Sequence, residues 1–336
     1  MQTGPKARTT VLKVLARFLL SAVVFGMIAW SVLAIYYSNL PAQWRPALAA
    51  IFVAAGLAAL FLIRPRHRGL LVFGILFVLL IAWWSAIPPS NDRVWDADVA
   101  VLPFAEISGN RIVLHNIRNC DYRTETDFDV HYYDKSFNLD QLSTLDLFTV
   151  YWGSPLICHT MLSFGFGNEG NVCISIETRK EKGEAYSSVK GFFRQYELTY
   201  VVADERDLIR LRTNYRGEQV YLYRLNAPPD RARNVFLDYL KEINSLKDKP
   251  EWYNTLTSNC TSNIRGHTKP YAPHSPWSWK LVVNGYVDEL AYANGALLQS
   301  LPFAELKKLS FVNERGKLAD KDPEFSKRIR EGLPGF

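Results

Sequence analysis

The chain has 336 residues, of which 48% are hydrophobic and 21% charged, so it is too long for one small module and too apolar for a disordered protein. Its net charge of +6 originates in the first 87 residues, which contain eight Lys and Arg residues and no Asp or Glu, whereas the rest of the chain contains 31 basic and 33 acidic residues. The basic balance is therefore no sign of nucleic-acid binding, and the long apolar runs in the same quarter exclude a soluble cytoplasmic enzyme.

Three apolar runs in the first quarter are each long enough to cross a bilayer as a helix. They are Val14–Tyr37, Pro46–Ile63 and Gly69–Ile87. Their middles carry no Asp, Glu, Lys or His, which favours an anchor over a transporter. Basic residues precede the first run and fill the second connection, and such segments stay in the cytoplasm. We predict a three-helix anchor over residues 1–91 in a bacterial inner membrane, with a cytoplasmic N-terminus and residues 92–336 on the periplasmic side.

Residues 92–336 alternate short strand patterns with later helical patterns, which is typical of an α+β domain. We expect strands at 99–104, 111–115, 145–151, 158–165, 172–179, 195–203 and 220–225, and helices at 229–246, 260–267, 279–295 and 302–309. The turn Ser108-Gly109-Asn110 predicts a hairpin between the first two strands, and the Gly- and Asn-rich segment 166–171 predicts antiparallel pairing of its neighbours. Residues 116–146 have no period that assigns them to a helix or a strand.

Cys260 differs from the other three cysteines in its setting. A dense polar stretch ends in Ser258 and Asn259, both good helix caps, directly before a short helical pattern. Cys260 is therefore expected in the first turn of a helix, where the helix dipole and free N–H groups lower the pKa of a thiol. This position suits a nucleophile whose oxyanion product is held by the same N–H groups.

His159 is the predicted general base for this thiol. Strand alternation places it on the more polar face of its strand, and the neighbouring strand presents Ser175 and Glu177 on one face. Either residue is placed to orient the imidazole as the third member of a catalytic group. His267 and His274, which flank the helix of Cys260, remain alternative bases.

The cysteines have a second possible use, because disulfides form outside the cytoplasm. Cys158 and Cys173 lie on neighbouring strands but face opposite sides, which argues against a bridge between them. The six histidines show no zinc-site spacing, and the phosphate-loop, dinucleotide and serine-hydrolase motifs are missing from the sequence. We therefore predict that the protein needs no metal or other cofactor.

Several linked motifs resemble the Lnb N-terminal periplasmic domain family. They are the segments 157–166, 174–179, 252–254 and 259–265, and a tail at 325–335. The resemblance implies a membrane-bound thiol transacylase that moves a fatty acyl chain of a bacterial lipoprotein, with Cys260 and His159 matching the family's catalytic Cys and His. The order of His before Cys is also similar to lecithin:retinol acyltransferase-like enzymes, which implies a circularly permuted papain or NlpC core.

The sequence thus predicts a thiol acyltransferase whose partners are the bilayer and a membrane lipid or lipoprotein, with an oligomeric state that the sequence does not define. Four further residues near the motifs are expected to bind substrate: Asn259, Arg179, Tyr253 and Arg265. Two alternatives stay open: a cysteine peptidase, amidase or lipase of the cell envelope, and a non-catalytic protein that binds an envelope component.

Overall fold

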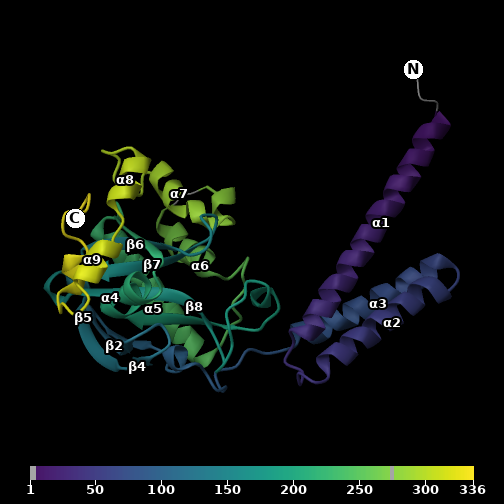
Figure 1. Cartoon of the computed structure of the whole chain (residues 1–336), viewed down its shortest axis with the longest axis horizontal. Coiled ribbons are helices and arrows are strands. Elements are labelled where there is room, and N and C mark those ends of the chain that lie inside the picture. Colours follow the sequence, from purple (N-terminus) through teal and green to yellow (C-terminus); the bar gives the residue numbers. More distant parts are fainter. Residues whose placement is uncertain (1–4, 273–275) are drawn as a thin grey trace. The chain divides into compact units, whose positions relative to one another are not determined.

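The computed structural model describes residues 5–272 and 276–336, and it begins with three apolar helices (Figure 1). They are α1 (Pro5–Tyr36), α2 (Arg45–Leu62) and α3 (Arg66–Ser85). Each contains a stretch of at least 18 residues that is long and apolar enough to cross a membrane, and α1 does so over Thr10–Tyr36. Most of their large side chains are exposed in the protein alone, as expected of surfaces that face lipid. The chain is therefore a membrane-anchored protein.

A short segment from much later in the chain, Val189–Gln195, packs with these three helices as one compact unit. Arg194 donates hydrogen bonds to the carbonyl oxygens of Ser85 at 2.7 Å and Ile87 at 3.1 Å, and its guanidinium lies over the ring of Trp84. A cation at this place satisfies carbonyl groups that the end of α3 leaves without partners. The segment thus closes the C-terminal end of the third helix.

The rest of the chain is built around a mixed eight-stranded sheet with the strand order β1-β2-β9-β8-β7-β6-β10, and β5 pairs with β2. The strands are β1 (Phe104–Ser108), β2 (Arg111–Arg118), β5 (Tyr132–Asn138), β6 (Thr144–Tyr151), β7 (Cys158–Gly165), β8 (Asn171–Arg179), β9 (Glu197–Ala203) and β10 (Gln219–Arg224). A separate small ribbon joins β3 (Asp121–Tyr122) to β4 (Phe128–Asp129). With the helices that cover it, this sheet confirms the α+β class.

Helices cover both faces of the sheet. On one face α5 (Pro229–Asp248) and α6 (Cys260–Thr268) share a buried core with alternate residues of the central strands. On the other face the core is closed by α4 (Glu205–Arg210), α9 (Asn313–Leu318) and α10 (Phe325–Arg328). The central strands are buried on both sides, which explains why their sequences read as near-continuous apolar runs.

The sequence predictions hold for most strands but fail elsewhere, and the helices α4, α9 and α10 were not predicted. The hairpin of β1 and β2 is confirmed, but β1 starts at Phe104 because Ala97–Val99 forms a 3-10 turn. The segment without a period contains β5, whose outward positions are polar. The single helix expected at 279–295 is wrong: two 3-10 turns, Trp279–Leu281 and Asn284–Tyr286, precede a short α7 (Val287–Ala293), and α8 is Phe303–Leu309.

A buried ion cluster ties the C-terminal tail to the sheet. Arg330 donates to Asp146 on β6 at 2.8 Å and to Glu205 on α4 at 2.6 Å, and both carboxylates are fully buried. The carboxylate of Asp146 also accepts a hydrogen bond from Arg224, and that of Glu205 one from Ser163. Removal of the arginine would leave two buried charges short of a partner.

Candidate active site

The ladder between β7 and β8 stops before the strands do. Their register runs from Gly165 opposite Asn171 to Met161 opposite Ser175 and goes no further, although β7 continues to pair with β6 as far as Cys158. The two strands therefore separate at one end of the sheet. The unpaired backbone and the side chains that face this opening are available for other contacts.

His159 lies in this opening, beside two polar side chains of β8. Its Nε2 atom is 2.7 Å from Ser175 Oγ and 3.2 Å from Glu177 Oε1, and Ser175 in turn donates to the same Glu177 oxygen at 2.6 Å. Arg212 also donates to this oxygen at 2.9 Å. Nε2 is thus fully occupied, which leaves Nδ1 as the ring nitrogen that can meet another group.

Helix α6 delivers Cys260 to the same opening, because it contacts both β7 and β8. Cys260 is its first residue, and Asn259 caps it: the Asn259 side chain accepts from Ser262 N at 2.9 Å, and Ser262 Oγ accepts from Asn259 N at 2.8 Å. This reciprocal capping fixes the start of the helix. The expectation of a cysteine in the first helical turn is confirmed.

Cys260 and His159 perturb each other's ionisation. Burial raises the pKa of the Cys260 thiol, but the charge of His159 and its hydrogen bond to the sulfur outweigh this and lower the pKa to about 7. Burial lowers the pKa of His159, but Glu177 and Cys260 outweigh it and raise the pKa to about 9. The pKa of Glu177 itself is held low by His159 and Arg212 against its burial. Between about pH 7 and 9 the pair is a thiolate and an imidazolium.

The Cys260 thiol is buried, but its surroundings are not apolar. The residue is only 6% exposed and belongs to the core on the α5 face. Both the backbone N–H and the side chain of Thr160 hydrogen-bond to the sulfur and help to lower its pKa. This N–H is free to do so because the β7–β8 ladder has already ended at Met161.

Two of the four residues expected to bind substrate make structural contacts within the domain. Arg179 is 3% exposed and donates to the carbonyl oxygens of Val99 and Ala100 and to Asn91, so its guanidinium does not face the thiol. Asn259 uses its side chain oxygen as the helix cap and donates from Nδ2 to Thr255 O at 2.7 Å. The cap at Asn259 agrees with the sequence, whereas the sequence could not reveal the buried contacts of Arg179.

Of the other two expected residues, Tyr253 lies close to the thiol and Arg265 lines a neighbouring cavity. Tyr253 is 7% exposed; burial raises the pKa of its phenol first, and the charge of Cys260 and a hydrogen bond with Tyr186 raise it further. Arg265 projects from α6 into the lining of an apolar cavity of about 510 Å³ that also includes Thr160 and Thr261, next to the sulfur. These two positions remain compatible with substrate binding.

The sequence also raised other bases, disulfides and metal binding as possible uses of the histidines and cysteines. His267 hydrogen-bonds Tyr200 at 2.7 Å and Asp238 at 2.8 Å within the core, so both ring nitrogens are occupied. His274 lies outside the described residues. All four cysteines are free thiols, and the described residues include no group that could hold a metal ion.

Sequence reasoning missed Asn284, which fastens the strand of His159 to the helix of Cys260. Its side chain donates to Cys158 O at 2.8 Å and to Thr261 Oγ1 at 3.0 Å, and it accepts from Cys158 N at 3.1 Å. The next residue, Gly285, has no room for a side chain, because a Cβ atom would lie 2.1 Å from Pro155 O. The Asn-Gly pair is a turn signal that should have divided the helix predicted there.

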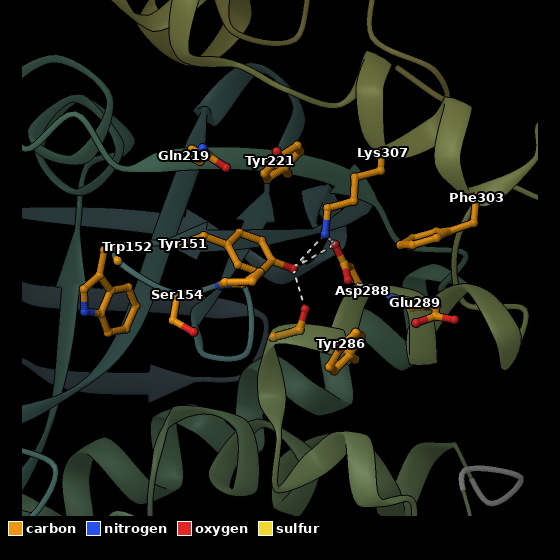
Figure 2. Close-up of a pocket in the computed structure, with 13 residues that line it drawn as sticks. Tyr151, Trp152, Ser154, Gln219, Tyr221, Tyr286, Asp288, Glu289, Phe303 and Lys307 are labelled. Carbon is orange, nitrogen blue, oxygen red and sulfur yellow. Dashed lines mark hydrogen bonds and ion pairs between the residues drawn. The ribbon is translucent and has the colours of Figure 1, made fainter.

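A second cavity of about 610 Å³ is lined by Tyr151, Asp288 and Lys307, among other residues (Figure 2). At its base Lys307 is 2.7 Å from the carboxylate of Asp288 and 3.0 Å from the hydroxyl of Tyr151. Tyr151 and Tyr223 both donate to Asp288, which is 1% exposed. The buried charge of Asp288 is thus balanced by the Lys307 ammonium and the two hydroxyl donors. The cluster holds α7 and α8 against β6 and β10.

Comparison with known proteins bears on this arrangement. Residues 128–285 match the model of a family described as the Lnb N-terminal periplasmic domain. Over these residues the chain is similar to that family. The matched segment, called the Lnb domain below, includes His159, Ser175, Glu177, Cys260 and Asn284, and the match confirms the resemblance expected from the sequence. No curated protein and no solved structure matches the chain.

Proposed function

We propose that the protein is a membrane-anchored thiol acyltransferase of the bacterial envelope that transfers a fatty acyl chain of a lipid or lipoprotein. The observation that carries the proposal is the pairing of Cys260 with His159, which is in turn held by Ser175 and Glu177. A thiol, an imidazole and an orienting carboxylate are the parts that covalent acyl chemistry requires. The family name supports an Lnb-like enzyme without specifying its chemistry.

The proposed reaction has two halves. The Cys260 thiolate attacks the carbonyl carbon of an ester, a C–S bond forms, and the leaving alcohol takes a proton from the His159 imidazolium as the C–O bond breaks. The acceptor amine then attacks the thioester while neutral His159 removes its proton. The C–S bond breaks and the thiolate–imidazolium pair returns, so protons and electrons balance over the cycle.

Helix α6 supplies a place for the negative charge of the tetrahedral intermediates. Its capping residue satisfies the N–H of Ser262, so the first-turn N–H groups of Cys260 and Thr261 remain to bind an oxyanion. Donors fixed in this way before the reaction are worth about 10²- to 10³-fold in rate. Arg265 is proposed to meet the polar head of the donor at the edge of the adjoining cavity.

The anchor suits a substrate whose chains remain in the bilayer, because tethering enzyme and substrate to one surface raises their effective concentration. We propose the inner membrane as the location, with the N-terminus in the cytoplasm and the Lnb domain in the periplasm, from the distribution of Lys and Arg around the spans. A cysteine at a helix start packed on a sheet that carries the histidine also supports a permuted papain or NlpC-like core.

The test measures acyl transfer by the full-length protein in lipid vesicles, from a radiolabelled diacyl lipopeptide or phospholipid to an N-terminal amine. Cys260→Ala and His159→Ala should abolish transfer. Cys120→Ala is the matched control, since this thiol is also buried but lies in a separate cluster, and it should retain activity. Full transfer by Cys260→Ala would refute the proposal, and release of free fatty acid without transfer would identify a hydrolase instead. A non-catalytic binding protein would show neither reaction.

A further inference from the structure

The apolar cavity beside Cys260 lies between the sheet, α5, α6 and α7. Its volume of about 510 Å³ falls in the range of about 300 to 1,000 Å³ that is usual for small-molecule sites. Aliphatic side chains and proline make up most of its lining: Leu145, Leu147, Leu162, Leu225, Ala227, Pro228, Val235, Ile264, Ala272, Leu281, Val287, Leu290, Ala291 and Ala296. A ligand that fills it must be mainly apolar.

The cavity lies next to residues that surround the reactive sulfur. Thr160 and Thr261 are both part of its lining. Thr160 hydrogen-bonds to the Cys260 sulfur, and Thr261 follows Cys260 in the first turn of α6. An acyl group whose carbonyl carbon is bonded to this sulfur therefore has an apolar space close by, past these two threonines.

We propose that this cavity binds one fatty acyl chain of the donor, in line with the ester carbonyl at Cys260, and that its depth selects the length of the transferred chain. The inference rests on the proposed acyl transfer and adds to it the site of the chain. A peptide is a poorer occupant, because its backbone N–H and C=O groups would lose their hydrogen bonds to water against aliphatic walls. A methylene chain has no such groups, and about every two methylenes buried should raise kcat/KM up to about tenfold until the cavity is full.

Helix α7 offers a matched pair of variants. Ala291 lines the cavity and is half-buried, whereas Ala293, two residues further on the same helix, is exposed and does not line it. Ala291→Trp should fill the space, and Ala293→Trp should leave it open. Neither residue belongs to the catalytic machinery.

The assay follows covalent acylation of Cys260 by p-nitrophenyl esters, from butyrate to palmitate, in full-length protein held in lipid vesicles. Wild type and Ala293→Trp should show rates that rise with chain length. Ala291→Trp should lose about tenfold or more of the dodecanoate and palmitate rates while keeping its butyrate rate within about twofold. An equal effect on short and long esters, or no effect on either, would overturn the inference.

A second variant covers the case in which tryptophan at position 291 prevents folding, which the loss of its butyrate rate would reveal. Leu290→Ala enlarges the cavity and should move the preferred ester to a longer chain, and an unchanged preference would overturn the inference. A different result would refute the proposed function itself: in wild type, no ester of any length would acylate Cys260 faster than it acylates Cys120.

Discussion

The substitution Glu177→Gln isolates the charge that supports the imidazolium. It keeps the size of the side chain and its capacity to accept from Ser175, but it removes the negative charge 3.2 Å from His159 Nε2. A carboxylate at such a distance raises the pKa of a histidine by about 1 to 3 units. The pKa of His159, raised to about 9 in the protein, should therefore fall to about 6 to 8.

The consequence for Cys260 follows from the sign of the coupling. The pKa of the thiol is lowered to about 7 by His159, and it loses this stabilisation once the imidazole is neutral. Its pKa should then rise toward the value of about 8.5 for a free cysteine. At pH 7.5 the thiolate fraction would fall from about three-quarters to about one-tenth, which is roughly an eightfold loss of reactive sulfur.

The assay is the rate of Cys260 alkylation by iodoacetamide as a function of pH, read by mass spectrometry of the Cys260 peptide. Glu177→Gln should shift the midpoint upward by about one unit or more and slow alkylation at pH 7.5 by roughly eightfold. Ser175→Ala, which removes no charge, should shift it less. Identical midpoints in Glu177→Gln and wild type would refute the electrostatic account of the pair.

Three further results are expected. The rate of acyl transfer should rise with pH through about 7, as Cys260 ionises, and fall through about 9, as His159 loses the proton that the leaving alcohol needs; a single limb in the profile would contradict this. Asn284→Ala should lower kcat by about 10- to 100-fold, because it misplaces the helix of Cys260. The pH midpoint of Cys260 alkylation should rise, and KM should stay nearly unchanged. A purely structural role of Asn284 would leave the alkylation midpoint of the folded protein at the wild-type value. Arg330→Met should cost about 3 to 5 kcal/mol of unfolding free energy by leaving Asp146 and Glu205 buried without their shared partner, measured by denaturant or thermal unfolding in detergent, and an unchanged midpoint would count against it.

Local patterns in the sequence predicted the parts of this fold that depend on local physics. The apolar runs and the strand alternation identified the three helices and β6 to β8, and the polar stretch before Cys260 identified the start of α6. These features follow from hydrophobic periodicity and capping, which act over a few residues. The approach of Cys260 to His159 followed from the family resemblance as much as from strand faces.

The features that escaped prediction depend on contacts between distant segments. Arg179 looks like a surface polar residue in the sequence, but the fold buries it against backbone groups that sequence alone does not locate. Arg212, which holds Glu177, lies on a turn of π-helix that continues an unpredicted α4. The end of the β7–β8 ladder, which creates the opening for the thiol, is a property of pairing that neither strand reveals separately.

The most direct test of the account is the intact mass of the full-length protein after brief incubation with a diacyl lipopeptide and quenching in acid. The account predicts a mass increase of one acyl group on Cys260, which is removed by neutral hydroxylamine and is missing in Cys260→Ala. Turnover of the donor with no acyl group on Cys260 at any time would contradict it.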